Sequence, residues 1–191
     1  MRVSDRFRLK VDFSPSLLLG DLERIERSDW IRHFVTQNYE GDWDILPLRG
    51  PSGAAHPVMM AYSDPTCEEF EDTPFLKECL YFQKVLATFP FELYAVRLMA
   101  LSPGSRIKEH RDLDLSLEEG TIRLHIPIRT SSDVEFVLSG ERVHMAEGEC
   151  WYLRLSDPHS VYNGSQINRV HMVLDAPCSP SVSKYISEYQ C

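Results

Sequence analysis

The stretch Ile122-Arg123-Leu124-His125-Ile126-Pro127-Ile128 alternates aliphatic residues with other residue types along its whole length. Because successive side chains of a β-strand point to opposite faces, the aliphatic residues share one face and Arg123 and His125 share the other. The segment 167–174 repeats the pattern, with an apolar face opposite a face that carries Arg169 and His171. Either polar face alone could be solvated, but an Arg and a His on two strands of one barrel favour a polar interior site.

Several short segments after residue 90 show the two-residue period of β-strands. Turn-forming residues such as Ser102-Pro103-Gly104 and Ser139-Gly140 separate them. The predicted strands span residues 91–101, 122–128, 133–138, 141–145, 150–155 and 167–174. Because two predicted helices precede this series, the sequence indicates a mainly β fold with flanking helices, a double-sheet β-barrel of the jelly-roll or cupin kind.

The N-terminal part contains those two helices and one further strand. Phe7 to Phe13 alternate with charged residues, which predicts a half-buried strand. Ser14-Pro15 then supplies a cap and a proline at the first helical position, and helical spacing continues to about Glu26. Thr73-Pro74 begins a second helix, whose apolar stripe reaches Phe89.

The chain has the size of one compact domain. Its 191 residues, 43% of them hydrophobic and 10% aromatic, bury one core and are too few to argue for two. We therefore expect a single domain over 1–191, with a helical and irregular part at about 1–90, a β core at about 91–175 and a tail at 176–191. The tail could be a lid, a packed segment or a dimer contact, and the oligomeric state stays open.

The charge balance narrows the possible partners. The chain has 29 acidic and 20 basic residues, a formal net charge of −9, and its basic residues are dispersed, which argues against nucleic acid. No apolar run approaches the roughly 20 residues that span a bilayer, and the N-terminus lacks the apolar core of a signal peptide, so we expect no membrane contact. Five cysteines without a close pair suit a reducing compartment. These features predict a cytoplasmic protein.

His110-Arg111-Asp112 and His159 contain the residue types of a mononuclear iron site. Two histidines and one carboxylate form a facial triad that binds Fe(II) and leaves three positions open for oxygen chemistry. His110 and Asp112, two residues apart in an extended segment, point to the same side. His159 lies 49 residues after His110 (159 − 110), which allows several hairpins between them. Our hypothesis is that His110, Asp112 and His159 form the catalytic metal site.

Four segments carry a family resemblance: RLHIPI at 123–128, GERVHMAEGECWYL at 140–153, DPHSVYN at 157–163 and NRVHMVLD at 168–175. In this order and spacing they resemble the aspartyl/asparaginyl β-hydroxylase family of Fe(II)- and 2-oxoglutarate-dependent oxygenases. The resemblance runs from about Phe91 to Asp175. It implies a double-stranded β-helix, which agrees with the predicted strand series.

The resemblance also implies roles for individual residues. His110 and His159 match the iron-binding histidines of the family. Arg169, ten residues after His159, matches the arginine that pairs with the far carboxylate of 2-oxoglutarate. Arg123 and His125 match positions that line the cosubstrate site. Arginine suits this task because it binds a carboxylate through two parallel hydrogen bonds that lysine cannot reproduce. The implied cofactors are Fe(II), 2-oxoglutarate and O₂.

Two positions depart from the family pattern. Animal members of the family lack the carboxylate ligand, whereas Asp112 stands at the proper place here, so we expect a complete triad. A complete triad argues against halogenation, because a halide would need the coordination position that the carboxylate fills. The family often has a serine before its Pro-Gly turn to help hold the cosubstrate, and Met99 occupies that position here.

The resemblance implies hydroxylation of an unactivated C–H bond in an amino-acid or peptide-like substrate, with release of succinate and CO₂. The substrate could be free, peptidyl or carrier-bound. Arg111 and Arg97 could contact an anionic substrate group or pair with nearby acids. One alternative is a non-catalytic, metal-containing cupin that binds or senses a small molecule. Another is a different metal oxygenase or isomerase on the same barrel.

The remaining histidines receive other roles. His125 and His171 are expected to hydrogen-bond around the site or contact substrate, and not to bind the metal. The irregular segment 30–65, with strand-like pieces such as 43–48, and the loop 113–121 are expected to cover a pocket and carry the substrate determinants. The histidines expected on the surface are His33, His56 and His144.

Overall fold

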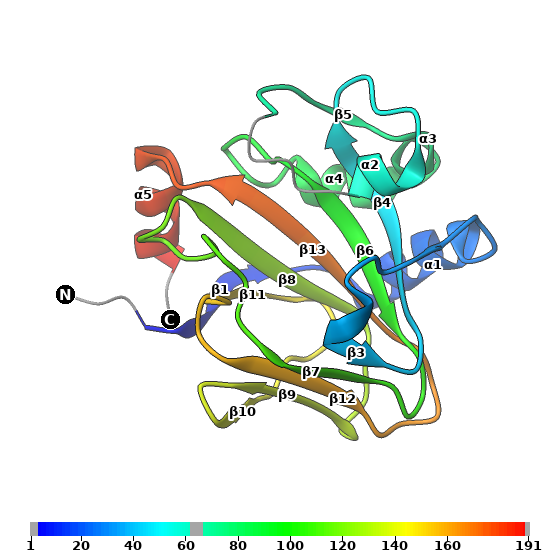
Figure 1. Cartoon of the computed structure of the whole chain (residues 1–191). Coiled ribbons are helices and arrows are strands. Elements are labelled where there is room, and N and C mark those ends of the chain that lie inside the picture. Colours follow the sequence, from blue (N-terminus) through cyan, green and yellow to red (C-terminus); the bar gives the residue numbers. More distant parts are fainter. Residues whose placement is uncertain (1–3, 62–66, 190–191) are drawn as a thin grey trace.

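Two antiparallel β-sheets lie face to face in the computed structural model, which describes residues 4–61 and 67–189 (Figure 1). In spatial order the larger sheet contains β1 (Arg6–Asp12), β11 (Glu149–Leu153), β8 (Thr121–Arg129), β13 (Arg169–Pro177), β6 (Val96–Leu101), β4 (Trp43–Pro51) and β2 (Ile31–Arg32), with β5 (Phe70–Asp72) paired to β4. The smaller sheet contains β10 (Glu141–Val143), β9 (Val134–Leu138), β12 (His159–Asn163), β7 (Arg106–His110) and β3 (Tyr39–Glu40). This arrangement confirms the predicted jelly-roll fold.

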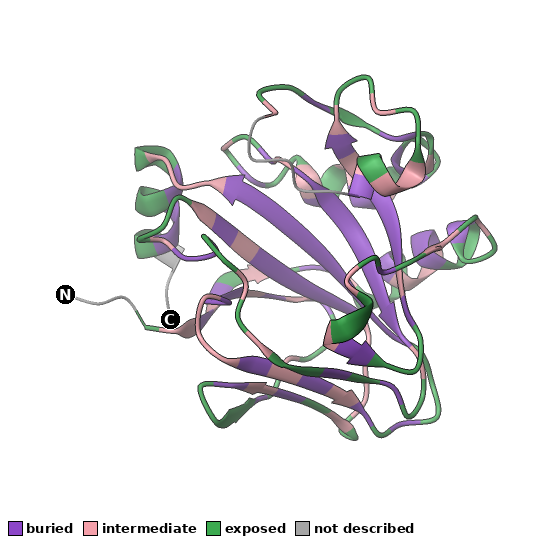
Figure 2. Ribbon diagram, viewed as in Figure 1, coloured by how far each residue is buried: buried purple, intermediate pink, exposed green. Residues whose placement is uncertain are grey.

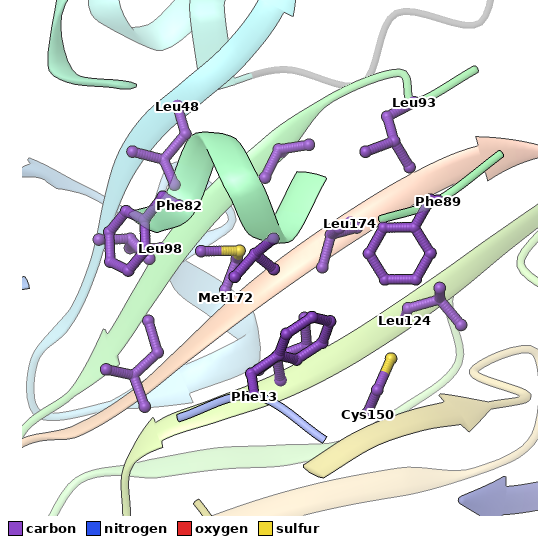
Figure 3. Close-up of a cluster of buried hydrophobic side chains, with 14 of the residues drawn as sticks. Phe13, Leu48, Phe82, Phe89, Leu93, Leu98, Leu124, Cys150, Met172 and Leu174 are labelled. Carbon is purple, nitrogen blue, oxygen red and sulfur yellow. The ribbon is translucent and has the colours of Figure 1, made fainter. Parts of the chain in front are cut away.

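Helices cover the outer face of the larger sheet. They are α1 (Pro15–Ile25), α3 (Pro74–Lys77), α4 (Leu80–Leu86) and α5 (Pro180–Tyr189). The short helix α2 (Pro57–Ala61) is not among them, because its buried Ala61 belongs to the apolar cluster between the sheets. A short 3₁₀ turn, η1 (Thr36–Asn38), precedes β3. Apolar side chains of α1, α3, α4 and α5 join those of the larger sheet in one buried cluster, part of which Figure 3 shows. None of the helices described by the structure has the length and apolarity to cross a membrane.

The central strands confirm the alternation that the sequence predicts. Ile122 to Ile128 place their aliphatic side chains in the helix-covered cluster, together with Met172 and Leu174 of β13 (Figure 3). A second apolar cluster fills the space between the two sheets and includes Val173 from the opposite face of β13. His125, paired with Val173 in the β8–β13 ladder, is 5% exposed. The polar faces therefore point into the barrel. β13 is buried along nearly its whole length, and β8 is buried except at the half-buried Thr121, Arg123 and Arg129 (Figure 2).

The smaller sheet contains two strands that the hydrophobic pattern does not predict, β7 and β12. Within β7 only Ile107 is buried. In β12 two of the three buried positions are polar, His159 and Asn163. Neither strand therefore shows an apolar period of two. The predicted strand over 91–101 begins later, at Val96.

The single helix predicted from Thr73-Pro74 to Phe89 is wrong, because the structure divides it into α3 and α4. Cys79, at the division, has the non-helical dihedrals φ −110° and ψ 85°. A carboxylate from another helix explains this division. Asp21 of α1, 6% exposed, accepts hydrogen bonds from the backbone N–H groups of Tyr81 at 2.7 Å and Phe82 at 2.9 Å. It thereby satisfies two free donors in the first turn of α4.

The segment 30–65 and the C-terminal tail contain helices and strands that the sequence does not predict. The region predicted as irregular contains β2, η1, β3, β4 and α2, and β4 extends the predicted piece 43–48 to Pro51; residues 62–65 of that region lie outside the described residues. The tail contains α5, whose Val182 and Ile186 are buried in the helix-covered cluster, as a packed segment would be. Residues 190 and 191 lie outside the described part.

We expect Asp21→Ala to lower the free energy of unfolding by about 1–2 kcal/mol, because two buried N–H groups lose their acceptor. Equilibrium urea denaturation of both proteins measures the difference. Glu23→Ala, at an exposed position of the same helix, is the matched control and should change stability by less than about 0.5 kcal/mol. Equal effects of the two substitutions would contradict the capping role.

Candidate active site

The structure brings His110, Asp112 and His159 together at one end of the smaller sheet. His110 ends β7 and pairs directly with His159 at the start of β12, with ring centroids 4.3 Å apart. Asp112 follows β7 and is held by its backbone N–H, which donates to the carbonyl of Leu155 at 2.9 Å. Each of the three residues offers one donor atom, and these atoms lie within 4.8 Å of one another. Residues 49 positions apart thus form one cluster of potential metal ligands.

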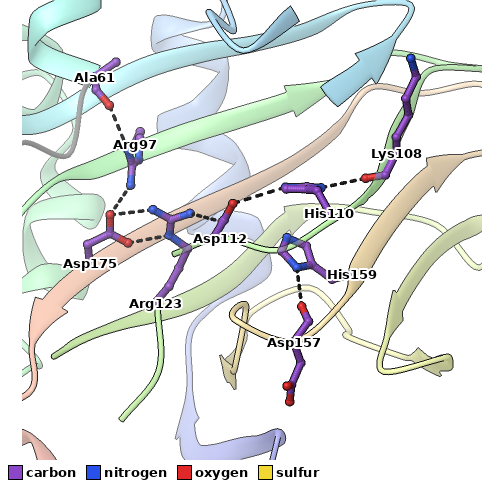
Figure 4. Close-up of polar contacts among 9 residues, drawn as sticks. All are labelled: Ala61, Arg97, Lys108, His110, Asp112, Arg123, Asp157, His159 and Asp175. Carbon is purple, nitrogen blue, oxygen red and sulfur yellow. Dashed lines mark hydrogen bonds and ion pairs between the residues drawn. The ribbon is translucent and has the colours of Figure 1, made fainter. Parts of the chain in front are cut away.

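Hydrogen bonds orient the two imidazoles of this cluster (Figure 4). His110 Nδ1 donates to the carbonyl of Lys108 at 2.7 Å, and His159 Nδ1 donates to the carbonyl of Asp157 at 3.0 Å. Because each proton is on Nδ1, each Nε2 keeps a lone pair for a metal. One carboxylate oxygen of Asp112, Oδ1, lies 3.4 Å from His110 Nε2. Two imidazole nitrogens and one carboxylate oxygen fit the donor set of an Fe(II) site.

The electrostatics of Asp112 and His159 favour protonation states that bind metal. In His110 burial lowers the pKa, but the contact with Asp112 outweighs burial and raises that pKa above its ordinary value, so a metal ion would compete with a proton there. Burial raises the pKa of Asp112, but the neighbouring His110 imidazole and the positive charge of Arg123 outweigh burial and hold that pKa below its ordinary value. Burial lowers the pKa of His159. Asp112 is therefore ionised and His159 neutral at physiological pH.

Arg169, at the start of β13, is a buried cation in the same cavity as the histidine cluster. It is 2% exposed, and burial lowers the pKa of its guanidinium to about 9. Among the described residues, no Asp or Glu forms an ion pair with it, and its Nε has no hydrogen-bond partner. Because an unpaired buried charge is costly, this guanidinium fits a carboxylate ligand.

His171 and His125 lie beside Arg169 on the inner face of the larger sheet. Arg169 donates from Nη2 to His171 Nδ1 at 2.8 Å, so the proton of His171 is on Nε2. The Nδ1 atoms of His125 and His171 are 3.4 Å apart. Burial lowers the pKa of both imidazoles well below the ordinary value, so both are neutral. The group of donor atoms that could hold a metal ion consists of His110, Asp112 and His159 and includes neither of these histidines.

Two further arginines share one carboxylate at the other end of β13 (Figure 4). Asp175 is fully buried and accepts from Arg97 and, at 2.6 and 2.9 Å, from Nε and Nη2 of Arg123. The remaining terminal nitrogen of Arg123 donates to Asp112 Oδ2 at 3.1 Å. Arg97, 4% exposed, also donates to the carbonyl of Ala61 at 2.9 Å. Both arginines therefore pair with acids inside the barrel, and both line the cavity.

The cavity has a volume of about 690 Å³. Its walls include residues from both segments expected to carry the substrate determinants, 30–65 and 113–121. Met99, which stands at the family's serine position, lies in the wall as well. Arg111 does not line this cavity: it is exposed and donates to the carbonyl of Ser156 at 3.0 Å. The structure therefore brings Arg97 to the cavity and leaves Arg111 outside it.

The expectation that His33 lies on the surface is wrong. His33 is 8% exposed and stacks on Trp43, with ring centroids 3.6 Å apart and planes 4° apart. Burial, followed by the positive charge of Arg97, lowers its pKa to about 4. His33 lines the cavity, and no periodic signal in its irregular segment predicts this. His56 and His144 are exposed, as expected.

Residues 18–177 match the family model described as aspartyl/asparaginyl beta-hydroxylase. The chain belongs to this family. The match covers most of the chain and includes all three residues of the candidate metal cluster, together with Arg169. It also extends over most of α1 and over the elements between α1 and residue 91, beyond the segments that carry the resemblance in the sequence.

Among curated relatives, an L-proline cis-4-hydroxylase of Rhizobium meliloti (strain 1021) is 28% identical over 177 residues. The alignment covers 91% of this chain and 61% of the relative. The chain therefore spans about three fifths of the length of this curated relative.

Solved structures of other proteins support the fold. HygX from Streptomyces hygroscopicus, with nickel and 2-oxoglutarate bound, matches with a TM-score of 0.58 and 9% identity, over 93% of this chain and 84% of that chain. The non-heme alpha ketoglutarate dependent epimerase SnoN from nogalamycin biosynthesis has a TM-score of 0.55 and 10% identity, over 90% and 76%. At these identities the likeness establishes the shared double-stranded β-helix alone.

We expect the metal-free protein to bind Mn(II), and His159→Ala to weaken this binding by more than about 100-fold, since even the hydrogen-bonding partners of ligands contribute 10- to 100-fold. Isothermal titration calorimetry measures both affinities. His56→Ala, which removes an exposed imidazole, is the control and should bind Mn(II) as the unaltered protein does. Unchanged binding by His159→Ala would contradict the assignment of the cluster.

Proposed function

We propose that this protein is an Fe(II)/2-oxoglutarate-dependent dioxygenase that hydroxylates an unactivated C–H bond of an amino-acid or peptide-like substrate and releases succinate and CO₂. One observation carries the proposal. A single cavity contains a two-histidine, one-carboxylate donor set and, apart from it, a buried guanidinium without a counter-ion among the described residues. A 2-oxo acid with a second carboxylate satisfies both features at once.

His110, Asp112 and His159 are the residues that would hold Fe(II). With both Nδ1 protons engaged by carbonyl groups, the imidazoles can turn only slightly, so the Nε2 atoms stay directed at the metal position. Bound there, Fe(II) supplies the redox chemistry that couples O₂ and 2-oxoglutarate to hydroxylation. Three protein ligands leave three positions for the 2-oxo acid and O₂.

Arg169 would bind the far carboxylate of 2-oxoglutarate. Its 2% exposure means that the ion pair forms away from water, where charge-assisted hydrogen bonds are strong. Neutral His171 accepts one N–H of the guanidinium, which restricts its rotation and leaves other N–H groups for the carboxylate. His125, whose Nε2 has no partner among the described residues, supplies a hydrogen-bond acceptor in the same wall.

Arg97 and Arg123 would meet the substrate. Arg123 pairs with Asp175, six residues along β13 from Arg169, and β-strands rise about 3.3 Å per residue, so the two ends are about 20 Å apart. This separation favours the substrate side for Arg123 over the cosubstrate site that the resemblance implies. Arg97 lines the cavity, and its Nε has no partner among the described residues, as a site for a substrate carboxylate requires.

An amino-acid class of substrate also agrees with the relative named L-proline cis-4-hydroxylase. The cavity volume of about 690 Å³ suits small molecules, for which pockets of about 300–1,000 Å³ are typical. Phe34 and Leu113, 40% and 87% exposed, give its mouth an apolar rim. We therefore place a carboxylate near Arg97 and apolar carbon near the rim.

Fe(II) and 2-oxoglutarate added together without oxygen should give a visible charge-transfer band, and subsequent aeration with a substrate amino acid should release succinate. Asp112→Ala should abolish both signals, because the iron loses its anionic ligand. Absorption spectroscopy and a succinate assay over free amino acids and short peptides measure them. Iron binding without the band or succinate would favour a non-catalytic binding protein.

Arg169→Met should lower the affinity for 2-oxoglutarate by about 10- to 100-fold, because hydrogen bonds to charged groups contribute about 1.5–3 kcal/mol. Arg169→Lys keeps the charge but not the planar fork, so its affinity for 2-oxoglutarate should lie between those of the unaltered protein and Arg169→Met. Titration of the charge-transfer band with 2-oxoglutarate gives the affinities. Arg27→Met, at an exposed position, is the control. If Arg169→Met left the 2-oxoglutarate affinity intact, another residue would bind the far carboxylate.

A further inference from the structure

Asp175 is a buried acid to which neither the metal cluster nor the cosubstrate site gives a role. Its side chain is fully buried on the inner face of β13. It accepts one hydrogen bond from Arg97 and two from Arg123 (Figure 4). One carboxylate thus orients two guanidiniums that face the cavity.

The contact continues from Asp175 to the metal cluster through Arg123. Nε and Nη2 of Arg123 pair with the two oxygens of Asp175, which fixes the plane of the guanidinium. In this plane the remaining nitrogen, Nη1, donates to Asp112 Oδ2 at 3.1 Å. The other oxygen, Asp112 Oδ1, lies on the side of His110 Nε2. The ion pair therefore presents one oxygen of Asp112 to the metal position and keeps the other engaged.

We propose that Asp175 is a positioning residue for the metal site: by holding Arg123, it makes Asp112 a one-oxygen ligand and keeps Arg123 from taking both oxygens. This inference rests on the proposed function, because it assumes that the cluster binds a divalent metal. Asp175 acts through Arg123, whose guanidinium contacts Asp175 with two nitrogens and Asp112 with the third.

Asp175 could act on the metal site through its charge or by orienting the Arg123 guanidinium, and an experiment can distinguish these two effects. Arg97 and Arg123 are balanced by Asp175 and Asp112, two positive and two negative groups. Of the two acids that Arg123 contacts, only Asp112 remains charged if Asp175 is neutralised. The guanidinium then turns its fork toward Asp112 and competes with the metal for the second oxygen. A variant that restores charge balance without restoring the fork distinguishes the two effects.

The experiment compares Mn(II) affinity, by isothermal titration calorimetry, in four proteins: unaltered, Asp175→Asn, the double variant Arg97→Met/Asp175→Asn, and the exposed control Asp133→Asn. We expect Asp175→Asn to weaken Mn(II) binding by about 10- to 100-fold, the usual effect of altering a residue that orients a ligand. The double variant has the original net charge and should remain weakened. Asp133→Asn should bind as the unaltered protein does.

Unchanged affinity in Asp175→Asn, or full recovery in the double variant, would overturn the proposal and reduce Asp175 to charge compensation. Circular dichroism on heating checks that each variant is folded. If Asp175→Asn does not fold, the charge-balanced double variant decides alone: weakened binding supports positioning, and normal binding refutes it. Failure of the unaltered protein to bind Mn(II) is a separate result, which contradicts the proposed function as well.

Discussion

The antiparallel pairing of β8 with β13 is the constraint on which the rest of the structure depends. Its register places Asp175 opposite Arg123 and Val173 opposite His125. The aliphatic side chains of both strands then lie under the helices, and the polar ones lie between the sheets. Because side chains alternate with a period of two, a shift by one residue would move every charged group of one strand into the helix-covered core. Burial of the aliphatic face thus determines where the charges lie.

Charges inside the barrel are balanced at one end and unbalanced at the other. Arg97, Arg123, Asp175 and Asp112 form a closed set of ion pairs. Arg169 has no such acid among the described residues, and burial depresses its pKa to about 9. Keeping an unpaired guanidinium in the interior costs stability in the free protein. A binding anion removes that cost, so the same feature that weakens the fold contributes to ligand affinity.

The parts that sequence predicts are those whose side chains repeat with a period. The strands β8 and β13 follow from alternating aliphatic residues, and His110, Asp112, His159 and Arg169 follow from residue type, spacing and family motifs. The hydrophobic pattern does not delimit β7 and β12, because polar residues such as His159 and Asn163 occupy buried positions there. Only the residue types around His110 and His159 indicate an extended segment and a strand at these places. The division between α3 and α4 depends on Asp21, which lies 60 residues before Tyr81, so local propensity cannot reveal it. His33 is buried by stacking on Trp43 of β4, a contact that depends on the pairing of β4 with β2 and that no local pattern around His33 reveals.

Candidate metal ligands and charged wall residues belong to different sheets. His110 and His159 lie on the adjacent strands β7 and β12, and Asp112 follows β7 directly. Arg97, Arg123 and Arg169 lie on β6, β8 and β13 of the opposite sheet. The rim is supplied by the segment around Phe34 and by the loop that contains Leu113. The candidate metal ligands and the rim residues are therefore carried by separate pieces of backbone. If the proposed function holds, substitutions in the rim would change which molecule enters while the imidazoles keep their places, so related chains could take new substrates without rebuilding the metal site.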